Sequence, residues 1–161
     1  VVAGALGDVT PNAPPPSSWA AQAEANVGVW TLRMEPGATW TLPATGEGTN
    51  RVLYFFNGGS LKVAGEDVSP MHAIQLEPES AVELVNGDQV AELLMLQGRP
   101  IGEPVVQHGP FVANRPEEIQ QAFQDYRRTG FGGWPWDQDG PTHPRDKGRF
   151  ARHSDGRVEE P

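Results

Sequence analysis

Short apolar runs separated by turn signals dominate the chain up to Leu96. Residues on the two faces alternate along Val27–Met34, which makes it a strand candidate. Further strand candidates are Arg51–Phe56 (RVLYFF) and Val90–Leu96 (VAELLML). Shorter strands are expected at 40–42, 60–63, 73–76 and 81–85. Tight turns are expected at 35–37, 57–59 and 86–88, where Pro, Gly and Asn gather. Many short, evenly spaced strands predict an all-β fold that is closed or sandwich-like, since closure removes exposed sheet edges.

The period of the apolar residues changes after Ala113 and predicts a single α-helix over about 115–129. One apolar face follows the helical repeat and consists of Ile119, Ala122, Phe123 and Tyr126. Asn114 and Glu117 are expected to form a capping pair, with Pro116 in the first turn. Two arginines precede Gly130, which is expected to end the helix.

Three prolines, at 100, 104 and 110, lie between the last predicted strand and the helix. Each fixes its own φ angle and biases the preceding residue towards extended conformations. Residues 98–113 are therefore expected to run as an extended arm over a neighbouring surface. Its apolar contacts would be Val105, Val106, Phe111 and Val112.

These patterns divide the chain into three parts: a β-barrel at 1–97, an arm with an amphipathic helix at 98–133, and a polar, partly ordered tail at 134–161. Residues 8–26 are expected to be an irregular loop within the first part. In the tail, Trp134 and Trp136 flank a proline. They would either pack on the protein itself or form an exposed apolar patch of the kind that contacts partners.

Charge and composition restrict the partners. Up to Tyr126 the chain has 5 basic and 15 acidic residues, and from Arg127 onward it has 7 basic and 6 acidic. An acidic body is a poor surface for phosphates, so direct binding of nucleic acid is not expected. The chain has no cysteine, and no apolar run is long enough to cross a bilayer. We expect a cytoplasmic protein with no membrane contact.

Several sequence blocks resemble the C-terminal part of the pirin family. They are GEPVV at 102–106, GPFV at 109–112 with Asn114, EEI at 117–119, DY at 125–126 and FG at 131–132. GWPW at 133–136 and the basic tail resemble bacterial members. The resemblance implies two cupin barrels in tandem, of which this chain would be the second. The expected fold class is therefore a cupin (double-stranded β-helix) barrel with one C-terminal helix.

The chain lacks the ligands of a metal-binding cupin. The cupin frame opens at Gly37 and closes at Gly58 or Gly59, but Pro43, Thr45 and Glu47 stand near the ligand positions. Proline has no side-chain donor, and one threonine with one glutamate makes a weak transition-metal site. The four histidines, at 72, 108, 143 and 153, are widely spaced. We predict no catalytic, cofactor-binding or metal-binding residue in this chain.

The resemblance leaves two functional hypotheses open. In the first, an absent N-terminal pirin cupin carries iron or another divalent metal and quercetin 2,3-dioxygenase-like activity, and this inactive half supplies packing and lid surface. In the second, the two-barrel protein is a redox- or metal-dependent regulatory module that binds another protein, as a transcription co-regulator or metabolic-enzyme partner. Candidate contacts with the missing domain or a partner are Val106, His108, Phe111, Ile119, Phe123, Tyr126, Trp134 and Trp136. If the missing barrel normally covers the helix face, the isolated chain should associate; if the helix folds back on this barrel, it should be monomeric.

Overall fold

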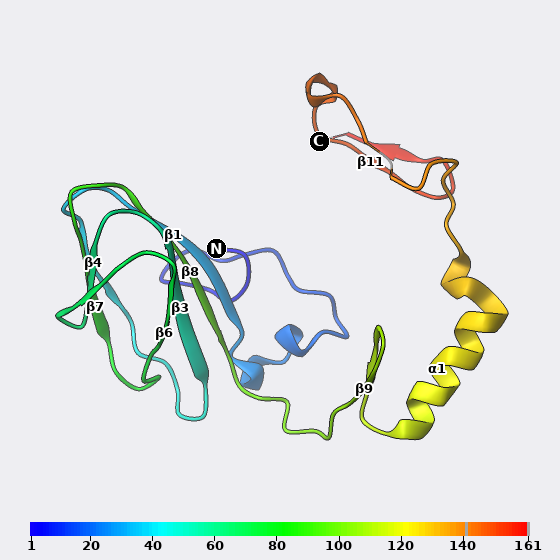
Figure 1. Cartoon of the computed structure of the whole chain (residues 1–161), viewed down its shortest axis with the longest axis horizontal. Coiled ribbons are helices and arrows are strands. Elements are labelled where there is room, and N and C mark those ends of the chain that lie inside the picture. The colour runs from blue at the N-terminus through cyan, green and yellow to red at the C-terminus, as the bar shows by residue number, and fades with distance from the viewer. Residues whose placement is uncertain (141, 161) are drawn as a thin grey trace. The chain divides into compact units, whose positions relative to one another are not determined.

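The computed structural model describes residues 1–140 and 142–160. The chain divides into two compact units, Val1–Gly102 and Glu103–Pro161 (Figure 1). The first unit contains the two larger sheets, and the second contains the α-helix and two small hairpins. The predicted all-β fold with one C-terminal helix is confirmed.

Two antiparallel four-stranded sheets build the first unit. One has the order β1 (Gly28–Met34), β8 (Ala91–Gly98), β3 (Asn50–Asn57), β6 (His72–Gln75). The other has the order β2 (Thr39–Leu42), β7 (Val82–Asn86), β4 (Leu61–Val63), β5 (Glu66–Val68). The longer strands alternate in burial, so every second residue faces the space between the sheets.

Strand β5 is an addition to the predicted set. It pairs with β4 across Ala64 and Gly65, whose φ angles are 51° and 86°. Two consecutive positive φ angles are typical of a type I′ hairpin turn, in which Asn-Gly is the usual pair. Alanine at the first position hides this turn from sequence inspection.

The core of the first unit is a single apolar cluster between the sheets. Its buried members are Trp30, Met34, Leu42, Leu53, Phe55, Leu61, Val63, Leu76, Val82, Leu84, Ala91, Leu93 and Met95. A buried amide, Asn86, stabilises one edge, since its Nδ2 atom donates to the carbonyls of Met34, Glu35 and Gln89 at 3.1, 2.8 and 2.7 Å. These bonds connect the turn after β1 to the turn after β7.

The segment before β1 is largely irregular. It contains two short 3₁₀ turns, Trp19–Ala21 and Ala23–Ala25. Asn26 then adopts a left-handed conformation with φ of 49° and leads into β1.

The predicted extended arm is wrong over residues 106–113. The chain instead forms a hairpin of β9 (Val106–His108) and β10 (Phe111–Ala113), with Gly109 (φ 56°) in the turn. The hairpin packs on helix α1 (Pro116–Thr129) of the same unit. Of the expected apolar contacts, Val105 and Val112 are 76% and 64% exposed. The prolines do favour extended backbone, but the turn-forming glycine reverses the chain direction.

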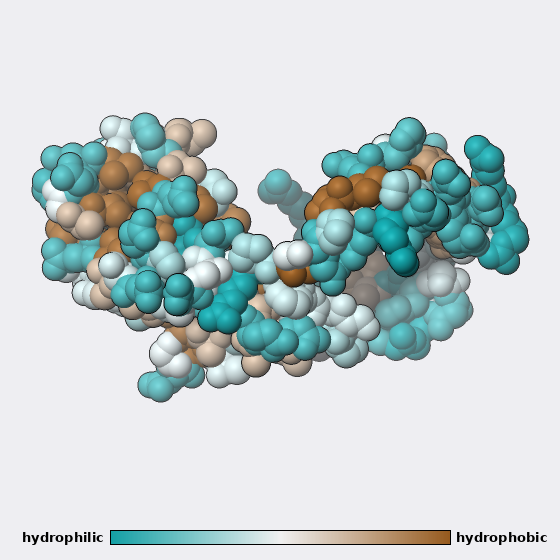
Figure 2. All heavy atoms as spheres, turned by 90° about the horizontal axis from the view of Figure 1, so that it is seen from below, coloured by the Kyte–Doolittle hydropathy of each residue, from teal (hydrophilic) through white to brown (hydrophobic). Residues whose placement is uncertain are grey.

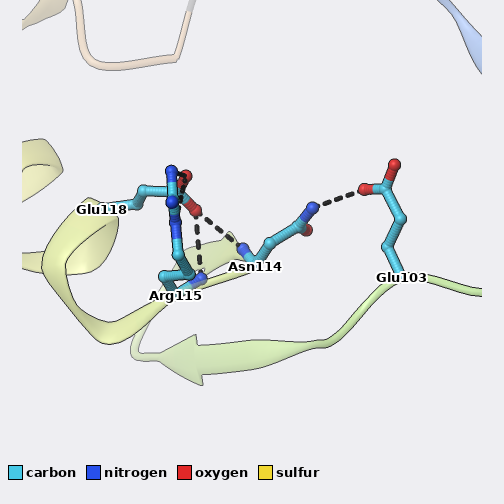
Figure 3. Close-up of polar contacts among 4 residues, drawn as sticks. All are labelled: Glu103, Asn114, Arg115 and Glu118. Atoms are coloured by element: carbon cyan, nitrogen blue, oxygen red, sulfur yellow. Dashed lines mark hydrogen bonds and ion pairs between the residues drawn. The ribbon is translucent and has the colours of Figure 1, made fainter.

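The helix has the predicted extent, but its cap differs from the prediction. Pro116 is the first helical residue, and the residue before a proline prefers extended backbone, so the cap is Arg115 and its partner is Glu118. Glu118 Oε2 accepts from the backbone N–H groups of Asn114 and Arg115, both at 3.0 Å (Figure 3). Asn114 bonds Glu103 through its side chain instead of capping the helix.

The tail has more regular structure than predicted. A 3₁₀ turn at Arg145–Lys147 precedes a two-stranded hairpin of β11 (Ala151–Arg152) and β12 (Val158–Glu159). Positions 141 and 161 of the predicted 134–161 tail lie outside the described residues. Across 1–140 and 142–160, every helix is too short or too polar to span a membrane.

Candidate functional site

The loop at 43–49, between β2 and β3, contains the residues that the sequence resemblance places near the ligand positions of a metal-binding cupin. Asn26 Nδ2 donates to the hydroxyls of Thr45 and Thr49, at 2.6 and 2.8 Å. Thr45 N donates to the carbonyl of Pro78 at 2.7 Å. The threonine hydroxyls thus bond the loop to the segment before β1, and the backbone N–H of Thr45 bonds it to the segment after β6.

Beside this loop lies a buried cation, Arg51. It occupies an inward position of β3, in the same alternating set as Leu53 and Phe55, and is 1% exposed. Its Nη1 atom donates to the carbonyl of Pro43 at 2.9 Å. Burial lowers the pKa of the guanidinium by desolvation. Sequence inspection treated Arg51 only as the start of a strand; a charged residue in register with Leu53 and Phe55 is the signal that would have marked it.

This arrangement does not fit a divalent metal. Pro43 presents a carbonyl already bonded to Arg51, Thr45 is bonded to Asn26, and Glu47 is exposed. A fixed positive charge beside the loop would also repel a metal cation. Within 1–140 and 142–160, no three His, Asp or Glu side chains gather as a metal site would require.

The four histidines lie in separate environments. His72 is exposed, and its Nδ1 atom lies 3.0 Å from the carbonyl oxygen of Ser69. His108 contacts the ring of Phe123 at a centroid distance of 5.4 Å. His143 stacks edge-on against Phe150 in the tail. His153 lies 3.5 Å from Glu159 and belongs to the tail hairpin.

All eight candidate contact residues belong to the second unit, and four of them form aromatic pairs. Phe111 meets Phe123 and Tyr126 in edge-to-face pairs, with ring centroids 4.8 and 6.5 Å apart. Phe131, which was not among the candidates, joins at 6.0 Å from Phe111 and 5.3 Å from Tyr126. We call His108, Phe111, Phe123, Tyr126 and Phe131 the aromatic cluster. The hairpin and the helix therefore cover part of each other's apolar surface.

The other candidates differ in exposure. Ile119 is buried and Val106 is half-buried. Trp134 is 57% exposed, with its indole N–H donating to the carbonyl of Gln138 at 2.8 Å. Trp136 is half-buried beneath the guanidinium of Arg152, 5.2 Å from the ring centroid. Tyr126 and Phe131 remain 53% and 59% exposed, so the aromatic cluster keeps an open side.

A second apolar surface lies on the outer face of the β1-β8-β3-β6 sheet. In register across three strands, Leu96 lies between Val29 and Val52, and Leu94 lies beside Tyr54. These side chains alternate with the core residues and point away from the core. Hydrophobic residues are visible on the surface of the barrel unit in Figure 2.

We call Val29, Val52, Tyr54, Phe56, Leu94 and Leu96 the outer sheet face. Tyr54 and Phe56 are 37% and 48% exposed, and the other four are half-buried. A sheet that meets water on one side normally alternates apolar and polar residues, whereas a sheet buried on both sides has nearly continuous apolar strands. The runs at 52–56 and 93–96 are of the second kind, and this continuity is the sequence signal that points to the face.

Comparison with known proteins identifies a family and several relatives of this chain. The family model described as the pirin C-terminal cupin domain matches residues 29–132. Pirin from Mus musculus is 44% identical over 109 residues, which cover 63% of this chain and 37% of pirin. A pirin-like protein from Caulobacter vibrioides is 36% identical over 96 residues, covering 60% of this chain and 34% of the relative.

A crystal structure of quercetin 2,3-dioxygenase from Acinetobacter baumannii superimposes with a TM-score of 0.62 at 26% identity. The match covers 81% of this chain and 42% of that one. The matched segments span 34–42% of the length of these relatives, which is less than half of each. The cupin fold expected from the sequence is confirmed.

Proposed function

Because this chain belongs to the pirin family and forms its C-terminal cupin domain, we propose that it is the half of a two-cupin protein that holds no metal. The other cupin would carry iron or a similar divalent metal and a quercetin 2,3-dioxygenase-like activity. The name of the structural relative from A. baumannii supports the reaction class. The buried guanidinium of Arg51 at the ligand loop supports the absence of metal from this half.

The observation that carries the proposal is the two-sided apolar sheet. Its inner face builds the core, and its outer sheet face needs cover from another apolar surface. Full burial of a large apolar side chain contributes roughly 1.5–3 kcal/mol. Tyr54 and Phe56, which are 37% and 48% exposed, would then contribute about 0.5–1.5 kcal/mol each when covered. The metal would supply dioxygen chemistry in the other cupin, and this chain would supply a packing surface that excludes water.

The interface can be tested by mixing this chain with the other cupin domain of the same protein, produced separately. Leu94→Glu places a carboxylate at the centre of the outer sheet face, and burying an unpaired charge costs several kcal/mol. We expect the dissociation constant to rise by at least about 100-fold. Thr39→Glu, on an exposed position of β2 in the other sheet, is the matched control and should leave binding unchanged. Equal dissociation constants for the wild type and Leu94→Glu would show that the outer sheet face is not part of the interface.

The activity can be tested on the complete protein by following dioxygen consumption with quercetin. We expect activity in the metal-loaded protein, none after metal removal, and none for this chain by itself. Full activity in the metal-free protein would contradict a metal-dependent dioxygenase.

An alternative function is a regulatory module that binds another protein. The exposed apolar residues of the second unit favour it, since Val112, Tyr126, Phe131 and Trp134 are each more than half exposed. The eight candidate contacts named from the sequence remain predictions for this surface. Trp134→Ala should abolish capture of a partner by the complete protein, whereas Val158→Ala, a 52% exposed position of the tail hairpin, should not. If the Trp134→Ala and Phe123→Ala variants both still capture the partner, the exposed apolar residues of the second unit are not the contact surface.

A further inference from the structure

Arg51 raises a question that the packing role leaves unanswered. A buried guanidinium is normally compensated by a carboxylate, because desolvating an unpaired charge costs several kcal/mol. Among the described residues, none of the ion pairs includes Arg51. Its Nε and Nη2 atoms are buried and have no hydrogen-bond partner within the described part of the chain.

The two unpaired atoms have a specific geometry. Nε and Nη2 lie on one edge of the planar guanidinium, and their N–H groups point in parallel, which is the fork that binds a carboxylate through both oxygens. The opposite corner, Nη1, is fixed by its 2.9 Å bond to the carbonyl of Pro43. The cation is therefore held in one orientation, and its carboxylate-binding edge is buried and unpaired.

The surroundings of Arg51 include polar side chains and the loop at 43–49. Gln97 lies beside Arg51 in the register of β3 and β8, and its Nε2 atom donates to Asn26. Arg99 lies against the same loop, since its Nη2 atom is 3.3 Å from the place that a Cβ at Gly46 would take. Pro43, Gly46 and Glu47 are exposed, so the loop that covers Arg51 faces solvent.

We propose that this end of the barrel binds a small carboxylate, held by the Nε and Nη2 atoms of Arg51. Such a ligand supplies the missing counter-charge and the two missing acceptors together. A single spherical anion would satisfy the charge but would fit the fork less well, since it offers one centre to two parallel donors.

The test uses the complete chain and acetate as the probe, with chloride at the same ionic strength as the comparison. At about tenfold above its dissociation constant, acetate should raise the thermal midpoint by several degrees. Chloride should give a clearly smaller rise. Arg51→Lys keeps a positive charge but lacks the fork, so it should lose the acetate-dependent rise. Arg33→Lys, at an exposed position of β1, should keep it.

Two further measurements make the result decisive. The side-chain Nε–H signal of Arg51 in the wild type should shift on addition of acetate and not of chloride, which does not depend on how well a variant folds. Glu47→Gln removes the carboxylate of the covering loop and should leave the acetate response unchanged. Equal effects of acetate and chloride would overturn the proposal, and so would an undiminished response in Arg51→Lys. Acetate binding that appears only in Glu47→Gln would also overturn it, because the chain's own carboxylate would then be the occupant.

Discussion

Replacing Arg51 by methionine should make the chain more stable. The guanidinium is 1% exposed, makes one hydrogen bond, and leaves Nε and Nη2 unpaired among the described residues. Methionine is similar in length and apolar, and it adjoins the buried cluster that contains Leu53 and Phe55. Substituting a buried ion by an apolar residue of similar volume is often neutral or stabilising.

The expected magnitude follows from two opposing effects. Loss of the hydrogen bond from the charged Nη1 to Pro43 costs roughly 1.5–3 kcal/mol. Removal of an uncompensated buried charge recovers several kcal/mol. We therefore expect a net stabilisation of about 1–3 kcal/mol, which for a unit of this size corresponds to a rise in Tm of roughly 4–8 °C per kcal/mol.

The assay is urea unfolding of the wild type and Arg51→Met in a buffer without carboxylates, followed by the same pair in acetate. Acetate should reduce the difference in unfolding free energy between Arg51→Met and the wild type, because it stabilises only the protein that retains Arg51. If Arg51→Met is less stable than the wild type by more than about 1 kcal/mol in the carboxylate-free buffer, the charge of the guanidinium is paired in solution. The reasoning from an unpaired charge is then refuted.

The remaining predictions concern the buried amide and the helix cap. Asn86→Ala should destabilise the chain by about 1–3 kcal/mol in urea unfolding, because it removes donors to three carbonyls; Asn57→Ala, which loses one exposed contact with Glu92, should change stability by less than about 0.5 kcal/mol. Comparable losses for the two variants would contradict the role given to Asn86. Hydrogen bonds from Arg115 and from the backbone of Asn114 and Arg115 lower the pKa of Glu118, so its contribution to helix stability should be present above the ordinary glutamate pKa and decline as the pH falls through the lowered value. Helix content measured against pH should show this decline in the wild type and not in Glu118→Gln, and identical profiles would exclude the cap contact.

Much of the fold could be predicted from local patterns. Alternation and turn residues located most strands, and the helical repeat with Gly130 located α1. The hairpin at 106–113 was missed because three prolines suggest an extended chain, while the reversal depends on Gly109 and on packing of Phe111 against Phe123. Contacts between residues distant in the sequence are not visible in a local pattern.

The candidate site, too, could be predicted only where it depends on local sequence. Pro43, Thr45 and Glu47 could be recognised as poor ligands from their side-chain chemistry. The unpaired edge of Arg51 could not be recognised, because it depends on which acceptors the folded chain brings near the guanidinium. The outer sheet face was present in the sequence as two continuous apolar runs, but its extent depends on the register that aligns Leu94 with Tyr54.

The central claim is that this cupin is the half of a pirin that packs and holds no metal. Elemental analysis of the complete protein and of this chain, each purified under the same conditions, tests it most directly. We predict one iron or similar divalent metal per complete polypeptide and no stoichiometric metal in this chain. A tightly bound metal in this chain at one per molecule would contradict the account, because Pro43 and Thr45 are poor metal ligands and the charge of Arg51 repels a cation.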